Sequence, residues 1–128
     1  MPENNLFEYA VIRIVPRVER EEFLNVGVIL YCRSRNFLAT KVTLNPERFA
    51  TFSQAVDVEE IQKYLHAFEQ IAAGSKDAGP IGQLDKASRF RWLTATRSTV
   101  LQVSKVHPGL CPGEPLEALE KLHRQLVL

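Results

Sequence analysis

One stretch near the N-terminus constrains the fold more than any other. Residues Asn25–Cys32 are apolar on both alternating faces after the first position. A strand of this kind needs cover on both sides, as a central strand of a sheet has. The chain is therefore expected to build further layers around this strand.

Three other segments have strand signals. Leu6–Val15 is rich in β-branched and aromatic residues and stops at Pro16, which cannot donate a backbone hydrogen bond. Phe37–Leu44 alternates after the polar turn 33–36, which predicts a hairpin and an antiparallel meander. Thr99–Val106 alternates as well and predicts a fourth strand.

Helix signals follow the early strands. Asn45 before Pro46 predicts a short helix through Phe52. Asp57 and Glu60 have capping-box spacing, and the helix that they open has apolar residues at helical offsets. Its expected buried face is Ile61, Leu65 and Phe68, and its expected end is Gly74. Two more helices are expected, from Asp85 to about Leu93 and from Pro115 onward.

Two segments lack a regular pattern. Residues 74–83 hold three Gly and one Pro and predict a flexible loop, and residues 107–115 are broken by three Pro and two Gly. We expect one α+β domain over residues 1–128, with an antiparallel sheet of about four strands and helices packed on it. The order of the strands stays open.

The balance of charges and the two cysteines limit the kinds of function to consider. Sixteen Lys and Arg face fifteen Asp and Glu, a net charge of +1, so any charged function must be local. Cys32 and Cys111 belong to no metal-ligand cluster, and we expect no metal, no cofactor and a reduced, cytoplasmic setting. We also expect no signal peptide and no membrane span.

A first polar block lies between the first two strands and is a candidate ligand or partner site. Its candidate residues are Arg17, Arg20, Glu21 and Asn25. Arginines beside an acidic pair can orient a phosphate or a carboxylate through bidentate contacts. A solvated loop whose charges pair with one another explains the same residues equally well.

A second polar block lies between residues 89 and 107. Arginines interleaved with an aromatic ring can bind a phosphodiester backbone and stack one base. The alternative is that Trp92 and Phe90 anchor the core while arginines form salt bridges at its rim, with His107 as a turn residue. The candidate residues here are Arg89, Arg91, Trp92, Arg97, Ser98 and His107. No catalytic triad, phosphate loop or metal-ligand spacing is legible.

The two blocks together resemble a bacterial protein family, domain of unknown function 3037. The resemblance runs from about Leu6 to about Leu119. It rests on Pro16, Arg20–Phe23, Asn25–Val28, Arg89–Leu93, Arg97–Thr99 and His107–Gly109. One departure is Ala95 to Arg97, where a Pro is expected before the Arg, which leaves the placement of Arg97 and Ser98 open. The family implies a small bacterial protein encoded near HipA-like kinases, and such a kinase is therefore a candidate partner.

Two functions remain open from the sequence. The first is a non-catalytic binding or regulatory module with a protein partner. The second is an enzyme or binder of a phosphate-bearing substrate such as nucleic acid, which we rank lower. The closing helix carries an apolar stripe that either meets a partner or a second copy, giving a homodimer, or completes the chain's own core. The stripe is Leu116, Leu119, Leu122 and Leu126.

Overall fold

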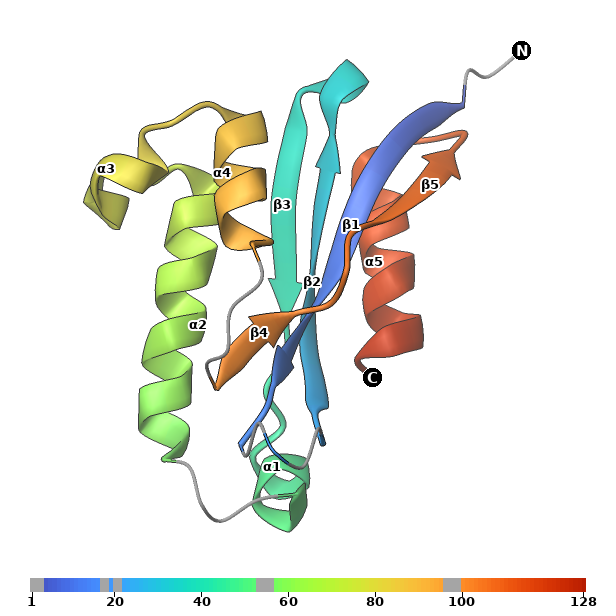
Figure 1. Ribbon diagram of the computed structural model, residues 1–128. Coiled ribbons are helices and arrows are strands. Elements are labelled where there is room, and N and C mark those ends of the chain that lie inside the picture. Colours follow the sequence, from blue (N-terminus) through green and yellow to red (C-terminus); the bar gives the residue numbers. More distant parts are fainter. Residues whose placement is uncertain (1–3, 17–18, 20–21, 53–56, 96–99) are drawn as a thin grey trace.

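The computed structural model describes residues 4–16, 19, 22–52, 57–95 and 100–128. Its centre is an antiparallel sheet of five strands (Figure 1). The strands are β1 (Asn5–Ile14), β2 (Leu24–Cys32), β3 (Phe37–Val42), β4 (Leu101–Val103) and β5 (His107–Cys111). The order is β3-β2-β1-β4, with β5 also paired to β1. The expected α+β class with an antiparallel sheet is confirmed.

Strands β4 and β5 together line one side of β1. β4 pairs with Ile12–Ile14 and β5 with Asn5–Tyr9, so the two short strands follow each other along the same neighbour. Ser104 joins them to β1, because its N–H donates to the Val11 carbonyl and its hydroxyl accepts from the Val11 N–H, both at 2.8 Å. The predicted fourth strand is therefore shorter than expected, and a fifth continues its line.

Helices cover both faces of the sheet (Figure 1). α2 (Val58–Ala73) and α4 (Lys86–Leu93) lie on one face with α1 (Pro46–Phe52), and α5 (Pro115–Leu126) lies on the other. One apolar cluster joins Ile12 and Ile14 to residues of α2 and α4, and a second joins Val28 and Leu30 to α5. The expected cover on both sides of β2 is thus present.

The helices begin and end where their capping residues predict. Asp57 accepts the N–H of Glu59 at the start of α2, and Gly74 ends that helix in the left-handed region with φ 70°. Ile61, Leu65 and Phe68 are buried, as expected. Asn45 and Asp85 cap α1 and α4 in the same way.

The apolar stripe of α5 completes the chain's own core. Leu119 is buried, Leu122 packs against the second cluster, and Leu126 is half-buried. Leu116 at the start of the helix is half exposed. Most of the stripe is therefore covered within the chain.

The expected break at residues 107–115 is wrong, because β5 occupies its first part. Pro108 is tolerated because it lies on the outermost strand, where its missing N–H leaves no ladder partner unsatisfied. Gly109 is needed because a Cβ there would lie 2.3 Å from Cζ of Phe7. Pro108 and Gly109, which usually interrupt strands, are thus compatible with this edge strand.

The segment 74–83 contains short helical turns. Lys76–Ala78 forms a 3₁₀ turn (η3), and Gly79–Gly82 forms a short helix (α3). The side chain of Ser75 caps the first turn by accepting the N–H of Asp77. Residues 33–35 form another 3₁₀ turn (η2) between β2 and β3, where a polar turn was expected.

Candidate functional site

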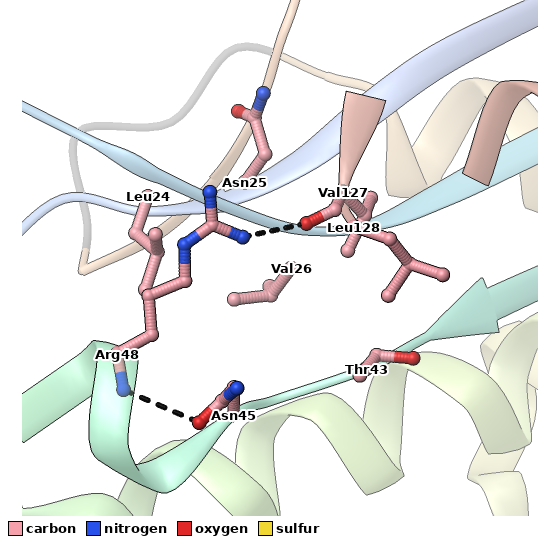
Figure 2. A pocket seen from close by; sticks show the side chains of 8 residues that line it. All are labelled: Leu24, Asn25, Val26, Thr43, Asn45, Arg48, Val127 and Leu128. Carbon is pink, nitrogen blue, oxygen red and sulfur yellow. Dashed lines mark hydrogen bonds between the residues drawn. The ribbon is translucent and has the colours of Figure 1, made fainter. Parts of the chain in front are cut away.

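A hollow of about 280 Å³ opens where the end of α5 meets the start of β2 and the end of β3 (Figure 2). We call it the α5-end pocket. It combines apolar and polar side chains, and one of the predicted site residues, Asn25, lies in it. The lining residues are Leu24, Asn25, Val26, Thr43, Asn45, Arg48, Val127 and Leu128.

A β-bulge in β2 points Asn25 toward α5. Ile12 pairs with Gly27 and Arg13 with Asn25, so Val26 is an extra residue in β2. In an unbroken strand residue 25 would point away from the α5 face, to which Val28 points. The bulge reverses this direction. Nδ2 of Asn25 donates to the carbonyl of Leu126 at 3.1 Å.

Arg48 reaches the same helix end from α1. Asn45 fixes the start of α1 by accepting the N–H groups of Glu47 and Arg48 at 3.0 and 3.2 Å. Nη1 of Arg48 then donates to the carbonyl of Val127 at 2.8 Å (Figure 2). Among the described residues, no carboxylate forms an ion pair with Arg48. In the described part of the chain, its guanidinium donates to the backbone carbonyl of Val127.

His123 lies beside the pocket in a buried position on α5. Its Nε2 is 2.9 Å from Oγ1 of the pocket residue Thr43. Burial, and then the positive charges of Lys41 and Arg124, lower the pKa of His123 below its usual value. The imidazole is therefore neutral near pH 7 and adds no charge to the pocket.

The chemistry left over in the pocket is that of a polar binding site. Nδ2 of Asn25 and Nη1 of Arg48 are engaged by the last carbonyls of α5, as in a helix C-cap. Oδ1 of Asn25 is buried and has no hydrogen-bond partner within the described ranges of the chain. That atom is closed to solvent, so the accessible polar chemistry of the pocket is the guanidinium of Arg48, which keeps further N–H donors and suits a small anionic group.

Arg89, on the opposite face of the sheet, has a structural position. It is buried, and its guanidinium donates to the carbonyls of Leu84 at 2.6 Å and Ala72 at 3.4 Å. Ala72 lies in the last turn of α2, where a positive charge complements the helix dipole. Gly74 leaves room for the guanidinium, because a Cβ there would lie 3.2 Å from Cζ of Arg89.

Arg91 and Trp92 face solvent on either side of α4. Arg91 makes a bidentate pair with Glu8 at 2.8 and 3.1 Å, which raises the pKa of Arg91. Phe90 is fully buried, whereas Trp92 is 41% exposed. Two positions along a helix differ by about 200° in direction, so only one of these rings can face the sheet. The interpretation of Trp92 as a core anchor is therefore wrong, and that of Phe90 is confirmed.

His107 is the first residue of β5, in a strand where a turn was expected. It is exposed, and its ring centroid lies 5.4 Å from that of Tyr9, its partner across the strands. No carboxylate or nucleophile is hydrogen bonded to it among the residues described. Its surroundings give it a packing contact on the sheet.

The candidate residues that the structure describes do not gather in one place. Asn25 points to the α5 face, and Arg89, Arg91 and Trp92 belong to α4 on the other face. His107 lies on the outer strand. Arg17, Arg20, Glu21, Arg97 and Ser98 lie outside the described residues.

An exposed apolar corner escaped the sequence reasoning. Leu6 and Leu110 are partners across β1 and β5, and they are 61% and 64% exposed. We call this pair and the outer edge of β5 the β1–β5 corner. The sequence did not predict it, because Pro108 and Gly109 conceal the strand formed by residues 107–111.

The described part of the chain contains no group of three or more His, Cys, Asp and Glu residues placed to hold a metal ion. None of its helices is both long and apolar enough to cross a membrane.

These features define an α+β protein with an antiparallel sheet between helices. Comparison with protein families then identifies it further. The chain belongs to the family described as Protein of unknown function (DUF3037), whose model matches residues 9–127. This confirms the resemblance seen in the two polar blocks. No curated protein and no solved structure matches the chain.

Proposed function

We propose that this chain is a non-catalytic binding module for a partner protein, and that the β1–β5 corner is its contact surface. The observation that carries the proposal is the exposure of Leu6 and Leu110 side by side, at 61% and 64%. Single exposed leucines are common on proteins, but an adjacent pair at a sheet edge is a typical interaction surface.

The surroundings of the pair support this role. α4 packs on α2 and, within the sheet, on β2 and β3, while Leu6 and Leu110 of β1 and β5 stay exposed. The ion pair of Arg91 with Glu8 lies on the same face of β1 as Leu6, two residues along the strand. Apolar anchors beside an arginine are characteristic of protein interfaces.

The alternative function is the binding of phosphates by Arg89, Arg91 and Arg97, of which Arg97 lies outside the described residues. Arg89 is buried against two carbonyls, and Arg91 is neutralised by Glu8. Neither offers a free guanidinium to a nucleic-acid backbone. Among protein partners, the family resemblance makes a HipA-like kinase the first to test, and a second copy of the chain is the other candidate.

The test compares three forms of the full chain in cross-linking capture from the native host, followed by binding of the purified partner. The double variant Leu6→Ser/Leu110→Ser removes the corner, and Leu84→Ser removes a leucine that is 42% exposed elsewhere. We expect the double variant to weaken partner binding by about a hundredfold or more, and Leu84→Ser to leave it unchanged. A partner that binds all three forms equally would overturn the proposal, as would recovery of nucleic acid alone.

A second candidate function is the binding of a small anionic molecule in the α5-end pocket. It is favoured by Arg48, which lines the pocket and has no carboxylate partner among the described residues. N-acetylglycine, which carries a carboxylate and an N–H, is a suitable probe, with inorganic phosphate for comparison. Saturable NMR shifts at Thr43 and Val127 that Arg48→Gln removes would support it. Their absence at millimolar probe would exclude this class of ligand.

A further inference from the structure

We propose that the partner adds an extended segment to the sheet, pairing its backbone with the outer edge of β5 at Leu110. This inference rests on the proposed function, since it names how the partner protein docks on the β1–β5 corner. Three features support it. Backbone groups of Leu110 and Pro108 face outward, apolar surface lies on both sides of the place for an added strand, and proline weakens pairing between two copies of this chain.

The hydrogen bonding of β1 fixes which groups of β5 face outward. The N–H of Ser104 donates to the carbonyl of Val11, so the backbone of Val11 faces the β4 and β5 side. Alternation along an antiparallel strand gives Tyr9 and Phe7 the same direction. Their partners His107 and Gly109 are then the hydrogen-bonded positions of β5.

The remaining positions of β5 face away from the sheet. These are Pro108 and Leu110, opposite Glu8 and Leu6. The outer edge thus offers the N–H and the carbonyl of Leu110 and the carbonyl of Pro108. An added antiparallel strand makes three backbone hydrogen bonds with these groups, provided that the residue opposite Pro108 has an N–H.

Apolar surface lies on both sides of the added strand. The residue opposite Leu110 places its side chain on the face where Leu6 and Leu110 are exposed. Its neighbours in the segment point to the α5 face, where a groove of about 310 Å³ runs between β5 and α5. The groove is lined by the apolar Phe7, Cys111, Ala118 and Leu122 and also by the charged Glu114, Glu117 and Lys121. Backbone pairing combined with pockets for alternate side chains is the usual mode of strand addition.

A second copy of the chain fits this edge less well than a foreign segment. In a two-fold pairing centred on Leu110, the two Leu110 residues bond to each other, but the carbonyl of Pro108 meets Pro112 of the second copy, which has no N–H. In a two-fold pairing centred on Gly109, each Pro108 lies opposite a Leu110 and supplies only an acceptor. Both arrangements give two backbone hydrogen bonds where a segment without proline gives three. The occupant that the edge favours is therefore an extended, apolar, proline-free segment of another protein.

The experiment separates backbone pairing from apolar contact at the same residue. Leu110→Ala keeps the N–H and removes most of the side chain, whereas Leu110→Pro also removes the N–H. Pro108→Ala adds a donor to the edge. The probes are the partner found by capture and a capped peptide of alternating threonine and valine, each tested with the full chain.

We expect Leu110→Pro to bind about fivefold or more weakly than Leu110→Ala, and Pro108→Ala to bind about fivefold more tightly than the unchanged chain. The same substitution of Pro108 should promote self-association in sedimentation, because it gives self-pairing its missing donors. In hydrogen exchange, the bound peptide should protect the amide of Leu110. The folding of each variant is checked by its unfolding transition.

Failure of this inference differs from failure of the proposed function. Strand addition is wrong if Pro108→Ala leaves the affinity for the partner unchanged and Leu110→Ala and Leu110→Pro bind it equally. If Leu6→Ser/Leu110→Ser still abolishes binding in that case, the corner is a contact surface without strand addition. If no partner depends on the two leucines, the proposed function itself is wrong. An affinity that rises with Pro108→Ala has no explanation in apolar contact alone.

Discussion

Arg89 is a residue whose position in the structure points to stability. Its guanidinium joins the end of α2 to the turn before α4 through the carbonyls of Ala72 and Leu84. Its Nε is buried and has no hydrogen-bond partner among the residues that the structure describes. Both carbonyls lose a charged donor when the side chain is removed, and hydrogen bonds to charged groups contribute more than neutral ones.

We therefore predict that Arg89→Met lowers the free energy of unfolding by about 2–4 kcal/mol. Arg91→Met is the matched control, because it removes an exposed pair with Glu8 and should cost about 1 kcal/mol or less. Urea unfolding of the three proteins measures both values. Equal losses would show that Arg89 contributes no more than a surface arginine.

His123 predicts a pH dependence of stability. Its pKa is lowered in the folded chain, first by burial and then by Lys41 and Arg124. The unfolded chain then takes up a proton that the folded chain does not, so acid favours unfolding. Stability is fully present above about pH 6.5, the ordinary pKa of histidine, and falls as the pH drops below it.

The measurement is urea unfolding of the unchanged chain and of His123→Gln between about pH 7.5 and 5.5. We expect the difference between them to shift by up to about 1.4 kcal/mol per pH unit in the acid part of this window. Parallel profiles across the whole window would contradict a lowered pKa.

At the scale of elements, α2 holds the first core cluster together. Leu65 is 3% exposed and packs with Ile61 and Phe68 beneath the sheet. Leu65→Ala should lower the free energy of unfolding by about 2–5 kcal/mol, as a buried truncation does. Tyr64→Ala, at a neighbouring position that is 46% exposed, should cost less than about 1 kcal/mol. If Leu65→Ala lowered the free energy of unfolding by less than about 1 kcal/mol, a different face of α2 would pack against the sheet.

In β5, substitutions at Gly109 and at its neighbour Phe7 are expected to be coupled. A Cβ at Gly109 would lie 2.3 Å from the ring of Phe7, so Gly109→Ala must displace either the ring or the strand. We expect it to destabilise the chain by about 1–3 kcal/mol, as overpacking does. Added to Phe7→Leu, which opens space at that contact, it should cost less. A double-mutant cycle in chemical unfolding gives the coupling, and simple additivity would place the ring elsewhere.

The elements that the sequence could predict are those with local signals. α2 follows from its capping residues and periodicity, and β2 follows from its two apolar faces. β5 could not be predicted, because Pro108 and Gly109 are acceptable only at an outer edge and beneath the Phe7 ring, and both facts depend on pairing with β1. The bulge at Val26 is hidden for the same reason, since register is a property of two strands.

At the scale of the whole molecule, the sheet decides which polar residues can cooperate. Asn25 and Arg89 belong to the two polar blocks of the sequence, yet they lie on opposite faces of the sheet. Asn25 was predicted as a site residue, whereas Arg48 and Thr43 of the same pocket were not, because α1 and the end of β3 meet α5 only in the folded chain. The leucines of the β1–β5 corner carry no chemical signal in sequence and emerge only from their exposure.

The charge of the whole molecule leads to the last prediction. The net charge is +1, and both described arginines of α4 are engaged by carbonyls or by Glu8. A nucleic-acid backbone is bound chiefly by free Lys and Arg that release counterions, so we expect no binding tighter than about 10⁻⁴ M at about 0.15 M salt. Fluorescence anisotropy with a labelled duplex DNA and a labelled single-stranded RNA measures this affinity. The affinity for the partner protein should change little when the salt concentration is raised. Tight, steeply salt-dependent retention of either nucleic acid that Arg91→Glu abolishes would contradict the prediction and return the arginines of α4 to a phosphate-binding role.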